Sequence, residues 1–235
     1  MKRLFLILLF SIQLLTVLAY DFKYKNVFYN LDKENKTAYV TYEQEIYDNS
    51  RTDYTGNITI ADKIEVNGET YIVNAIGNFA FAECIDLLSV KIPTNIEVIG
   101  NNAFAGCISL EEFTLPNSLK YIGEQAFAFC NTIKTIILPN QVISIGAQAF
   151  NQCLSLTSLF IPNMVTDIDY DAFYDCKSLK NVYISDLAAW CNINFSTMYS
   201  NPLFYAQNLI LRNKVLNNVS IPQTVTEIKP YTFLG

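Results

Sequence analysis

The chain has 235 residues, 51% of them hydrophobic, and a net charge of −6 at pH 7. An acidic surface repels phosphate backbones and anionic lipid headgroups, so nucleic acid is an unfavourable partner. There is no histidine, which excludes Ser-His and Cys-His nucleophilic mechanisms, and no Cys-x-x-Cys pair of the kind that binds zinc. We therefore expect no enzyme, no metal site and no cofactor.

The first nineteen residues have the pattern of a secretory signal peptide. Lys2 and Arg3 precede an almost unbroken apolar run from Leu4 to Leu18, and Ala19 offers a small residue for cleavage. The run is short for a membrane span, which needs about 20 apolar residues, so a retained anchor is the weaker alternative. We predict cleavage after Ala19 and a mature chain that is secreted or at the cell surface, with no membrane span.

Residues 20–74 contain no repeat, and we interpret them as a small amino-terminal β cap. Apolar stretches at 38–42, 58–60 and 64–73 predict strands. Asn67-Gly68 predicts a hairpin turn within the last stretch, because both turn positions need positive φ. Such a cap would shield the edge of the following repeats from water and from other chains.

A 23-residue repeat organises residues 75–186, which we interpret as five coils of a solenoid. Four coils contain IGNFAFAEC, IGNNAFAGC, IGEQAFAFC and IGAQAFNQC, and the fifth, IDYDAFYDC, lacks the glycine. The spacing of Ile99, Ala103 and Cys107 predicts one apolar face of a short helical turn. Each coil continues into an alternating strand that ends near a proline, so stacked coils would form an α/β solenoid with one short parallel β-sheet.

One cysteine and one phenylalanine recur in each coil, and we predict that they form a structural ladder. The cysteines could pair as disulfides in a secreted protein, but side chains on stacked coils point in parallel, which is poor geometry for a bond. Free cysteine packs as a small buried hydrophobe, so buried thiols are the favoured interpretation. The ladder consists of Cys84, Cys107, Cys130, Cys153 and Cys176, with Phe81, Phe104, Phe127, Phe150 and Phe173.

The 23-residue frame is interrupted by an insertion at residues 187–218, which holds the only tryptophan and the sixth cysteine. Residues 219–235 then restart the repeat as a partial final coil. A coil without a successor exposes its core, so either something else covers it or the chain is a fragment of a longer protein. We also expect a hairpin in the insertion, with Leu209 and Leu211 facing Val215 and Leu216.

The pattern Ile-Gly-x-x-Ala-Phe-x-x-Cys-x-x-Leu, followed by a strand and proline, resembles the BspA-like leucine-rich repeat family. The resemblance covers residues 75–186 closely and 219–233 partly, and the insertion resembles inserts of bacterial members. It implies a secreted or cell-surface protein, and some members of the family adhere to matrix proteins or to other cells. Asp169 and Lys229 stand where glycine is usual, and Ser185 where proline is usual, which predicts less regular last coils.

The outward strand positions offer a candidate protein-binding surface. Along the column Lys91, Thr114, Ile137, Phe160 and Tyr183, the side chains change from polar to apolar, and the last three would lie side by side. Exposed apolar patches mark contact sites, and solenoid sheets make extended binding faces. The structural alternative, which is slightly favoured, is that such residues simply suit strands or that the insertion covers them.

These features together predict an exported, non-enzymatic repeat protein that binds another protein or a cell surface in an adhesion-like role. Two alternatives stay open. One is a carbohydrate-binding or carbohydrate-active surface protein, although no two carboxylates are positioned across a cleft by the repeat. The other is a structural spacer within a larger surface protein.

Overall fold

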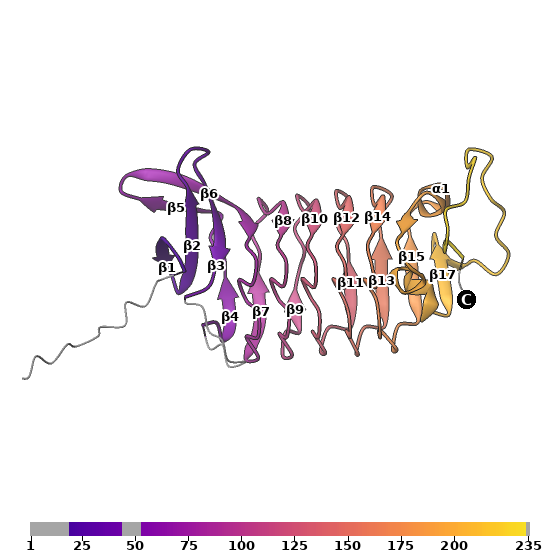
Figure 1. Ribbon diagram of the computed structural model, residues 1–235, viewed down its shortest axis with the longest axis horizontal. Coiled ribbons are helices and arrows are strands. Elements are labelled where there is room, and N and C mark those ends of the chain that lie inside the picture. The colour runs from indigo at the N-terminus through magenta and orange to yellow at the C-terminus, as the bar shows by residue number, and fades with distance from the viewer. Residues whose placement is uncertain (1–18, 44–52, 234–235) are drawn as a thin grey trace, which may run out of the picture.

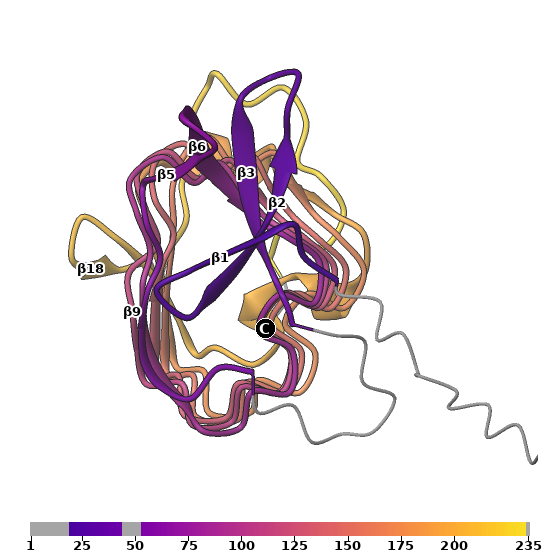
Figure 2. The same ribbon diagram turned by 90° about the vertical axis from the view of Figure 1, so that its left-hand side faces the viewer.

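The computed structural model describes residues 19–43 and 53–233. The predicted signal peptide falls almost wholly outside the described residues. Figure 1 shows an elongated solenoid, in which successive coils lie side by side along the long axis. Viewed down that axis, the coils superimpose on one another around a common core (Figure 2).

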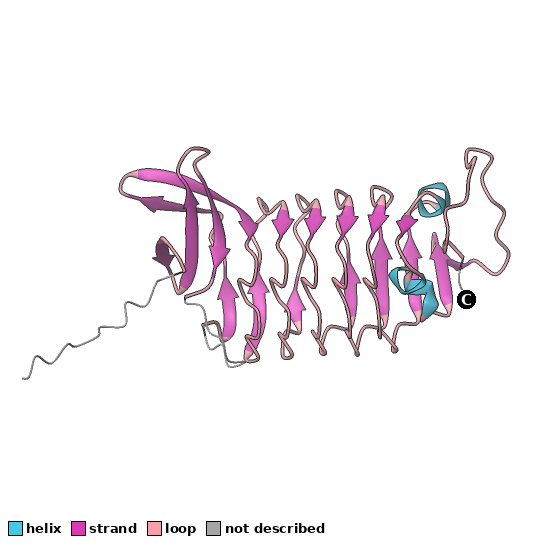
Figure 3. Ribbon diagram, in the orientation of Figure 1, coloured by secondary structure: helices cyan, strands magenta, loops and turns pink. Residues whose placement is uncertain are grey.

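Strands form most of the regular secondary structure of the described residues, and Figure 3 shows that the few helical turns lie near the carboxyl-terminal end. The helices are α1 (Leu187–Cys191) and the 3-10 helices η1 (Met198–Ser200) and η2 (Pro202–Phe204). The strands are β1 (Phe22–Tyr24), β2 (Val27–Asp32), β3 (Thr37–Thr41), β4 (Gly56–Thr59), β5 (Lys63–Val66), β6 (Glu69–Ile76), β7 (Leu87–Lys91), β8 (Val98–Ile99), β9 (Glu112–Phe113), β10 (Tyr121–Ile122), β11 (Thr135–Ile137), β12 (Ser144–Ile145), β13 (Ser158–Ile161), β14 (Asp167–Ile168), β15 (Asn181–Ile184), β16 (Asn194–Phe195), β17 (Asn208–Leu211) and β18 (Lys214–Val215).

Two sides of the solenoid carry strands, where the sequence predicted one short parallel sheet. One side has a ten-stranded sheet in the order β1-β2-β3-β6-β8-β10-β12-β14-β16, with β5 paired to β6. The other side has a three-stranded sheet, β4-β7-β9, and a five-stranded sheet, β11-β13-β15-β17-β18. Strands of successive coils pair in parallel, as the stacking of identical units requires.

The predicted helical turns are wrong: the segments between Ile-Gly and Cys are successions of turns. Around Phe104, Asn102 and Gly106 have positive φ, which interrupts a right-handed helix. The amides of these three residues donate across to carbonyls of the next coil at 2.8 Å. Because neighbouring coils satisfy these amides, helical bonds are not needed. The α/β class is therefore not confirmed, and the fold is a β-solenoid with almost no helix among the described residues.

The repeated glycine allows close approach between coils. A Cβ added to Gly123 would lie 2.6 Å from the backbone carbon of Gly100 and 2.7 Å from the amide of Asn101. Such contacts are too short for a side chain, so glycine at this position lets the coil lie close against the backbone of the preceding coil. Asp169 occupies the same column without breaking it, since β14 still pairs with β16. Its carboxylate accepts a hydrogen bond from Ser196 Oγ at 3.0 Å.

The core is a stack of one phenylalanine ring per coil. Rings from Phe81 to Phe173 lie at centroid distances of 4.9, 5.1, 5.4 and 5.5 Å with interplanar angles of 5° to 8°. At the amino-terminal end, Tyr54 continues the stack, with its ring 4.5 Å from Phe81. Burying each such ring stabilises the fold by about 1.5–3 kcal/mol, so the stack is a major source of stability.

One phenylalanine outside this stack divides the second side into two sheets. Phe113 stands at the inward position that Val90 and Ile136 hold in neighbouring coils. Its ring packs on Phe127 at 5.2 Å. We attribute the missing pairing between β9 and β11 to this larger side chain, because β9 still pairs with β7. Strand β11 therefore forms an edge of the five-stranded sheet.

Two hairpins predicted from the sequence are present. Strands β5 and β6 pair through Asn67-Gly68, both with positive φ. Strands β17 and β18 pair Ile210 with Val215, through a turn at Arg212 and Asn213 that also has positive φ. The amide of Leu216 donates to the carbonyl of Leu209 at 2.9 Å, as the predicted pairing requires. Leu211, in contrast, pairs with Lys214 instead of Val215 or Leu216.

The insertion stays within the solenoid as a longer coil. Strand β16 pairs with β14, and β17 pairs with β15, so both sides continue through it. Asn194 bonds to Asp167, 27 residues earlier instead of 23. The insertion also contacts the last coil, because Trp190 Nε1 donates to the carbonyl of Thr232 at 3.2 Å. In that last coil, Phe233 is 41% exposed. The division of the chain into cap, five coils, insertion and partial final repeat remains a prediction.

Candidate functional site

The predicted binding residues lie side by side on three adjacent strands. Ile137 of β11 pairs with Phe160 of β13, which pairs with Tyr183 of β15. Ile137 is 68% exposed, and Phe160 and Tyr183 are partly exposed. Their neighbours along each strand, such as Leu159, are buried in the core, as the alternation of a strand requires. The three side chains therefore form a continuous apolar row on the outer surface.

A second, polar row runs parallel to the first. Thr135, Ser158, Asn181 and Asn208 pair in turn on β11, β13, β15 and β17. Asn208 Nδ2 donates to Asn181 Oδ1 at 2.9 Å, which links the last two strands. The sequence interpretation missed this row, although it stands two residues before each apolar position. Uncharged hydroxyl and amide groups thus accompany the apolar side chains along the same surface.

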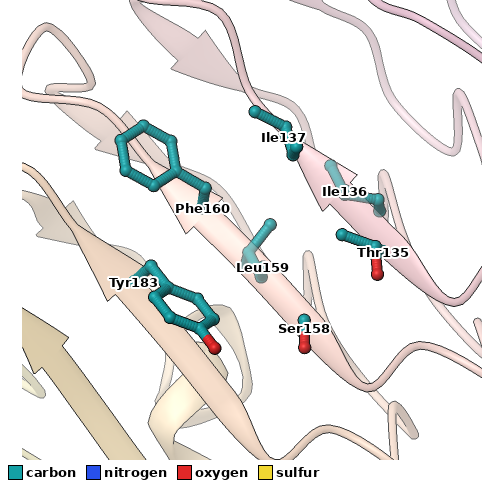
Figure 4. A pocket seen from close by; sticks show the side chains of 7 residues that line it. All are labelled: Thr135, Ile136, Ile137, Ser158, Leu159, Phe160 and Tyr183. Carbon is teal, nitrogen blue, oxygen red and sulfur yellow. The ribbon is translucent and has the colours of Figure 1, made fainter. Parts of the chain in front are cut away.

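The two rows line a shallow cavity of about 410 Å³. Figure 4 shows Ile137, Phe160 and Tyr183 in one line and Thr135 and Ser158 in the other. We call this surface the sheet face, defined by these five residues together with Asn181. A rigid sheet holds all six side chains in place before any ligand arrives, which reduces the entropy lost on binding.

The insertion borders the sheet face and does not cover it. Tyr183 pairs with Ile210 of β17, which is buried, and Ile210 pairs with Val215 of β18, which is 45% exposed. Figure 2 shows β18 projecting outward from the side that carries β9. The β17–β18 hairpin therefore forms a ridge at one end of the sheet face, and the edge strand β11 forms the other end.

The ladder residues all lie in the core. The five cysteines and five phenylalanines are 0% exposed, and none of these cysteines is in a disulfide. The thiols of Cys107, Cys130, Cys153 and Cys176 donate to the carbonyls of Phe81, Phe104, Phe127 and Phe150 at 3.0 to 3.2 Å. Burial raises the pKa of Cys176 to about 12 and raises those of the other three donors as well. Protonated and inaccessible, these thiols are poor nucleophiles and poor metal ligands.

Neither a metal centre nor a membrane span is found in the described residues. No group of three or more histidine, cysteine, aspartate or glutamate side chains there could hold a metal ion. No helix among residues 19–43 and 53–233 is long and apolar enough to cross a membrane.

A family model described as the BspA type leucine rich repeat region matches residues 74–200 in six copies. The chain belongs to this family. The resemblance drawn from the Ile-Gly-x-x-Ala-Phe-x-x-Cys pattern is thus confirmed. BspA-type repeat proteins are not generally enzymes, and no curated protein matches the chain.

Solved structures of leucine-rich repeat proteins share the fold. A leucine-rich repeat protein from Bacteroides ovatus is 27% identical, with a TM-score of 0.51 over 71% of this chain and 50% of that protein. A leucine rich cell surface protein from Faecalibacterium prausnitzii is 24% identical, with a TM-score of 0.50 over 71% and 55%. The pneumococcal vaccine antigen PcpA is 20% identical, with a TM-score of 0.56 over 81% and 49%. The BspA-type chain thus spans about half the length of each of these three proteins.

Proposed function

We propose that this BspA-type chain is an exported, non-enzymatic repeat protein that binds a partner protein at the cell surface, in an adhesion-like role, through the sheet face. The observation that carries the proposal is the row of Ile137, Phe160 and Tyr183, held in register on adjacent strands, with Ile137 exposed and the two aromatic side chains partly exposed. Soluble proteins rarely leave such a row exposed unless it is a contact site. The similarity to the Faecalibacterium prausnitzii protein, a leucine rich cell surface protein, supports a place at the cell surface.

The chemistry of the sheet face suits recognition of a protein chain. Phe160 and Tyr183 provide large, rigid side chains of the kind that dominate protein interfaces. The row of Thr135, Ser158 and Asn181 provides hydrogen-bonding groups beside them. A partner could bury apolar side chains on one row and satisfy polar groups on the other. The ridge formed by the β17–β18 hairpin would limit its position along the solenoid.

The test measures binding to an array of purified extracellular matrix proteins. The native chain and the double variant Phe160→Ser/Tyr183→Ser are each applied to the array. The matched control is Tyr121→Ser, because Tyr121 is an exposed aromatic residue on β10 of the other sheet. We expect at least one matrix protein to bind the native chain and the control alike, and the double variant at least tenfold more weakly. Circular dichroism and urea unfolding verify that both variants are folded.

The same variants separate the alternatives on a glycan array. Binding to a glycan that the double variant loses, with no matrix protein bound, would replace the proposal with carbohydrate recognition. Equal binding of a matrix protein by all three chains would place the site elsewhere. No binding on either array would favour the structural spacer.

A further inference from the structure

The charges of the carboxyl-terminal half of the solenoid are segregated. Residues 121–233 contain six cations. Two of them are ion-paired, Lys177 with Asp175 at 2.7 Å and Lys229 with Glu227 at 2.9 Å. The other four are exposed and make no ion pair within the described residues. These four are Lys134, Lys180, Arg212 and Lys214.

All four unpaired cations border the five-stranded sheet. Lys134 immediately precedes β11, and Lys180 immediately precedes β15. Arg212 follows β17, and Lys214 begins β18, so both lie in the hairpin that forms the ridge. The sheet face therefore has basic groups at the start of two of its three strands and at one end, although the whole chain is acidic.

Carboxylates of the same half lie mainly on the other sheet. Asp167 is in β14, Asp169 and Asp171 follow that strand closely, and Glu124 follows β10. Asp186 is the one carboxylate that closely follows a strand of the five-stranded sheet, and its Oδ1 accepts a hydrogen bond from the amide of Ala189 at 2.7 Å. Beside the sheet face, four cations without an ion pair in the described residues thus stand against one carboxylate, Asp186, and such an excess attracts negative charge.

The basic border stops at the edge strand β11, and carboxylates stand at the equivalent place in the preceding coil. One coil before Lys134, the equivalent position holds Glu111, and Glu112 follows it. Both lie beyond the break between β9 and β11. The apolar row and the basic border therefore begin at the same edge strand and end at the same ridge.

We propose that the partner of the sheet face presents an extended, acidic peptide segment, in which apolar side chains are flanked by Asp or Glu. The inference rests on the proposed function and adds the chemistry of the partner. Three strands at about 4.8 Å spacing span about 10 Å, which an extended segment covers with about three residues. Carboxylates a few residues to either side then reach the lysines and the hairpin. Complementary charge of this kind mainly raises the rate of association and sets specificity.

The test is selection from a random linear peptide library on the full chain, compared with three double variants. Phe160→Ser/Tyr183→Ser removes the apolar row, and Lys134→Gln/Lys180→Gln removes two border cations. Lys177→Gln/Lys229→Gln is the matched control, because it removes the two cations that are already ion-paired. Synthetic copies of the selected peptides are then titrated at low and high salt.

We expect the selected peptides to exceed the library in Asp and Glu, and to need Phe160 and Tyr183. Their affinity should fall about tenfold in Lys134→Gln/Lys180→Gln at low salt and stay unchanged in the control. The difference should shrink as salt screens the charges.

Other outcomes overturn the inference in distinguishable ways. If the selected peptides need Phe160 and Tyr183 but contain no more Asp and Glu than the library, the acidic partner is rejected and the sheet face remains the binding site. Acidic peptides that bind Lys134→Gln/Lys180→Gln as tightly as the control Lys177→Gln/Lys229→Gln would also reject the acidic partner and leave the sheet face as the binding site. Failure to select any peptide that depends on Phe160 and Tyr183 would reject the sheet face itself. Retention on heparin that needs Lys134 and Lys180, without acidic bias in the peptides, would make the partner an anionic polysaccharide.

Discussion

The thiol of Cys130 donates a hydrogen bond to the carbonyl of Phe104, in the preceding coil, over 3.1 Å. The same relationship recurs at three further cysteines of the ladder. Each bond joins the two repeated residues of the ladder across a boundary between coils. The cysteine therefore contributes a hydrogen-bond donor as well as packing. Alanine, which has no side-chain donor, could supply only the packing.

Replacing Cys130 with alanine should remove a hydrogen bond worth about 0.5–1.5 kcal/mol of the free energy of unfolding. The loss is no larger because the carbonyl of Phe104 keeps the amide of Cys107 as a second donor, at 3.1 Å. Cys130→Ser keeps a donor at the same position and should recover part of that loss. Urea unfolding followed by circular dichroism measures both. Equal losses for alanine and serine would show that the hydrogen bond contributes nothing.

Stability should fall in alkaline solution because of the cysteine ladder. The folded pKa of Cys176 is raised to about 12, mainly by burial. In the unfolded chain a thiol ionises near pH 8.5. Its contribution is fully present below that value and is lost as pH rises towards the folded pKa, with a slope of up to about 1.4 kcal/mol per pH unit for each such thiol.

Urea unfolding at pH 7, 8.5 and 10 measures this loss. Tyrosine and lysine also titrate in alkaline solution, so the control is the variant Cys153→Ala/Cys176→Ala. Its stability should depend less steeply on pH than that of the native chain. The same slope in both proteins would contradict the assignment to the thiols.

The phenylalanine stack should be most sensitive at its centre. Phe127 lies between Phe104 and Phe150 and also contacts Phe113. Phe127→Ala should cost about 3–5 kcal/mol, the usual range for a buried ring. Phe233 holds the same repeat position in the last coil but is 41% exposed, so Phe233→Ala should cost less than about 1 kcal/mol. Comparable losses in thermal unfolding would refute the importance of stacking.

The glycine column predicts a strong dependence on position. Gly123→Ala should destabilise the fold by about 1–3 kcal/mol, because its Cβ would meet backbone atoms that cannot move independently. Asp169 already carries a Cβ in the same column, so Asp169→Ala should cost only the two exposed hydrogen bonds that its carboxylate accepts, from Ser196 Oγ and from the amide of Tyr170. Denaturant midpoints compare the two variants. A harmless Gly123→Ala would mean that the coils can separate locally.

The last coil should loosen when Asn201 is replaced. Its side-chain amide donates to the carbonyl of Thr232 at 3.0 Å, and Trp190 donates to the same carbonyl. Asn201→Ala should red-shift the emission of Trp190, the only tryptophan, as water reaches the ring. Asn217→Ala, at an exposed position, is the control. Unchanged emission in Asn201→Ala would show that the packing of the coil alone holds it.

The length of the coil and the stacking of like residues were predictable because the repeat is a property of the sequence itself. Because Cys107 and Cys130 hold the same position in successive repeats, every other residue one repeat apart, such as Phe104 and Phe127, must stack as well. The Asn67-Gly68 hairpin was predictable because positive φ at two successive residues is a local preference. The apolar row was predictable for the same reason as the ladder, since Ile137 and Phe160 stand one repeat apart.

The helical turn was not predictable from spacing alone. The positions of Ile99, Ala103 and Cys107 fit a helix, but they also fit a succession of turns whose amides bond to the next coil. Only the neighbouring coil decides between the two, because it offers the competing acceptors. The break at Phe113 has the same origin, since the effect of its size depends on what it packs against.

By itself, therefore, the sequence determined the repeat, its family and the residues that fill the core. The tertiary structure decided which sides carry strands, where the sheet is interrupted, and that Lys134 and Arg212 border one surface. The physical reason is that hydrogen bonds and charges between coils join residues distant in the chain. Local preference cannot specify such partners, and they exist only once the coils are stacked.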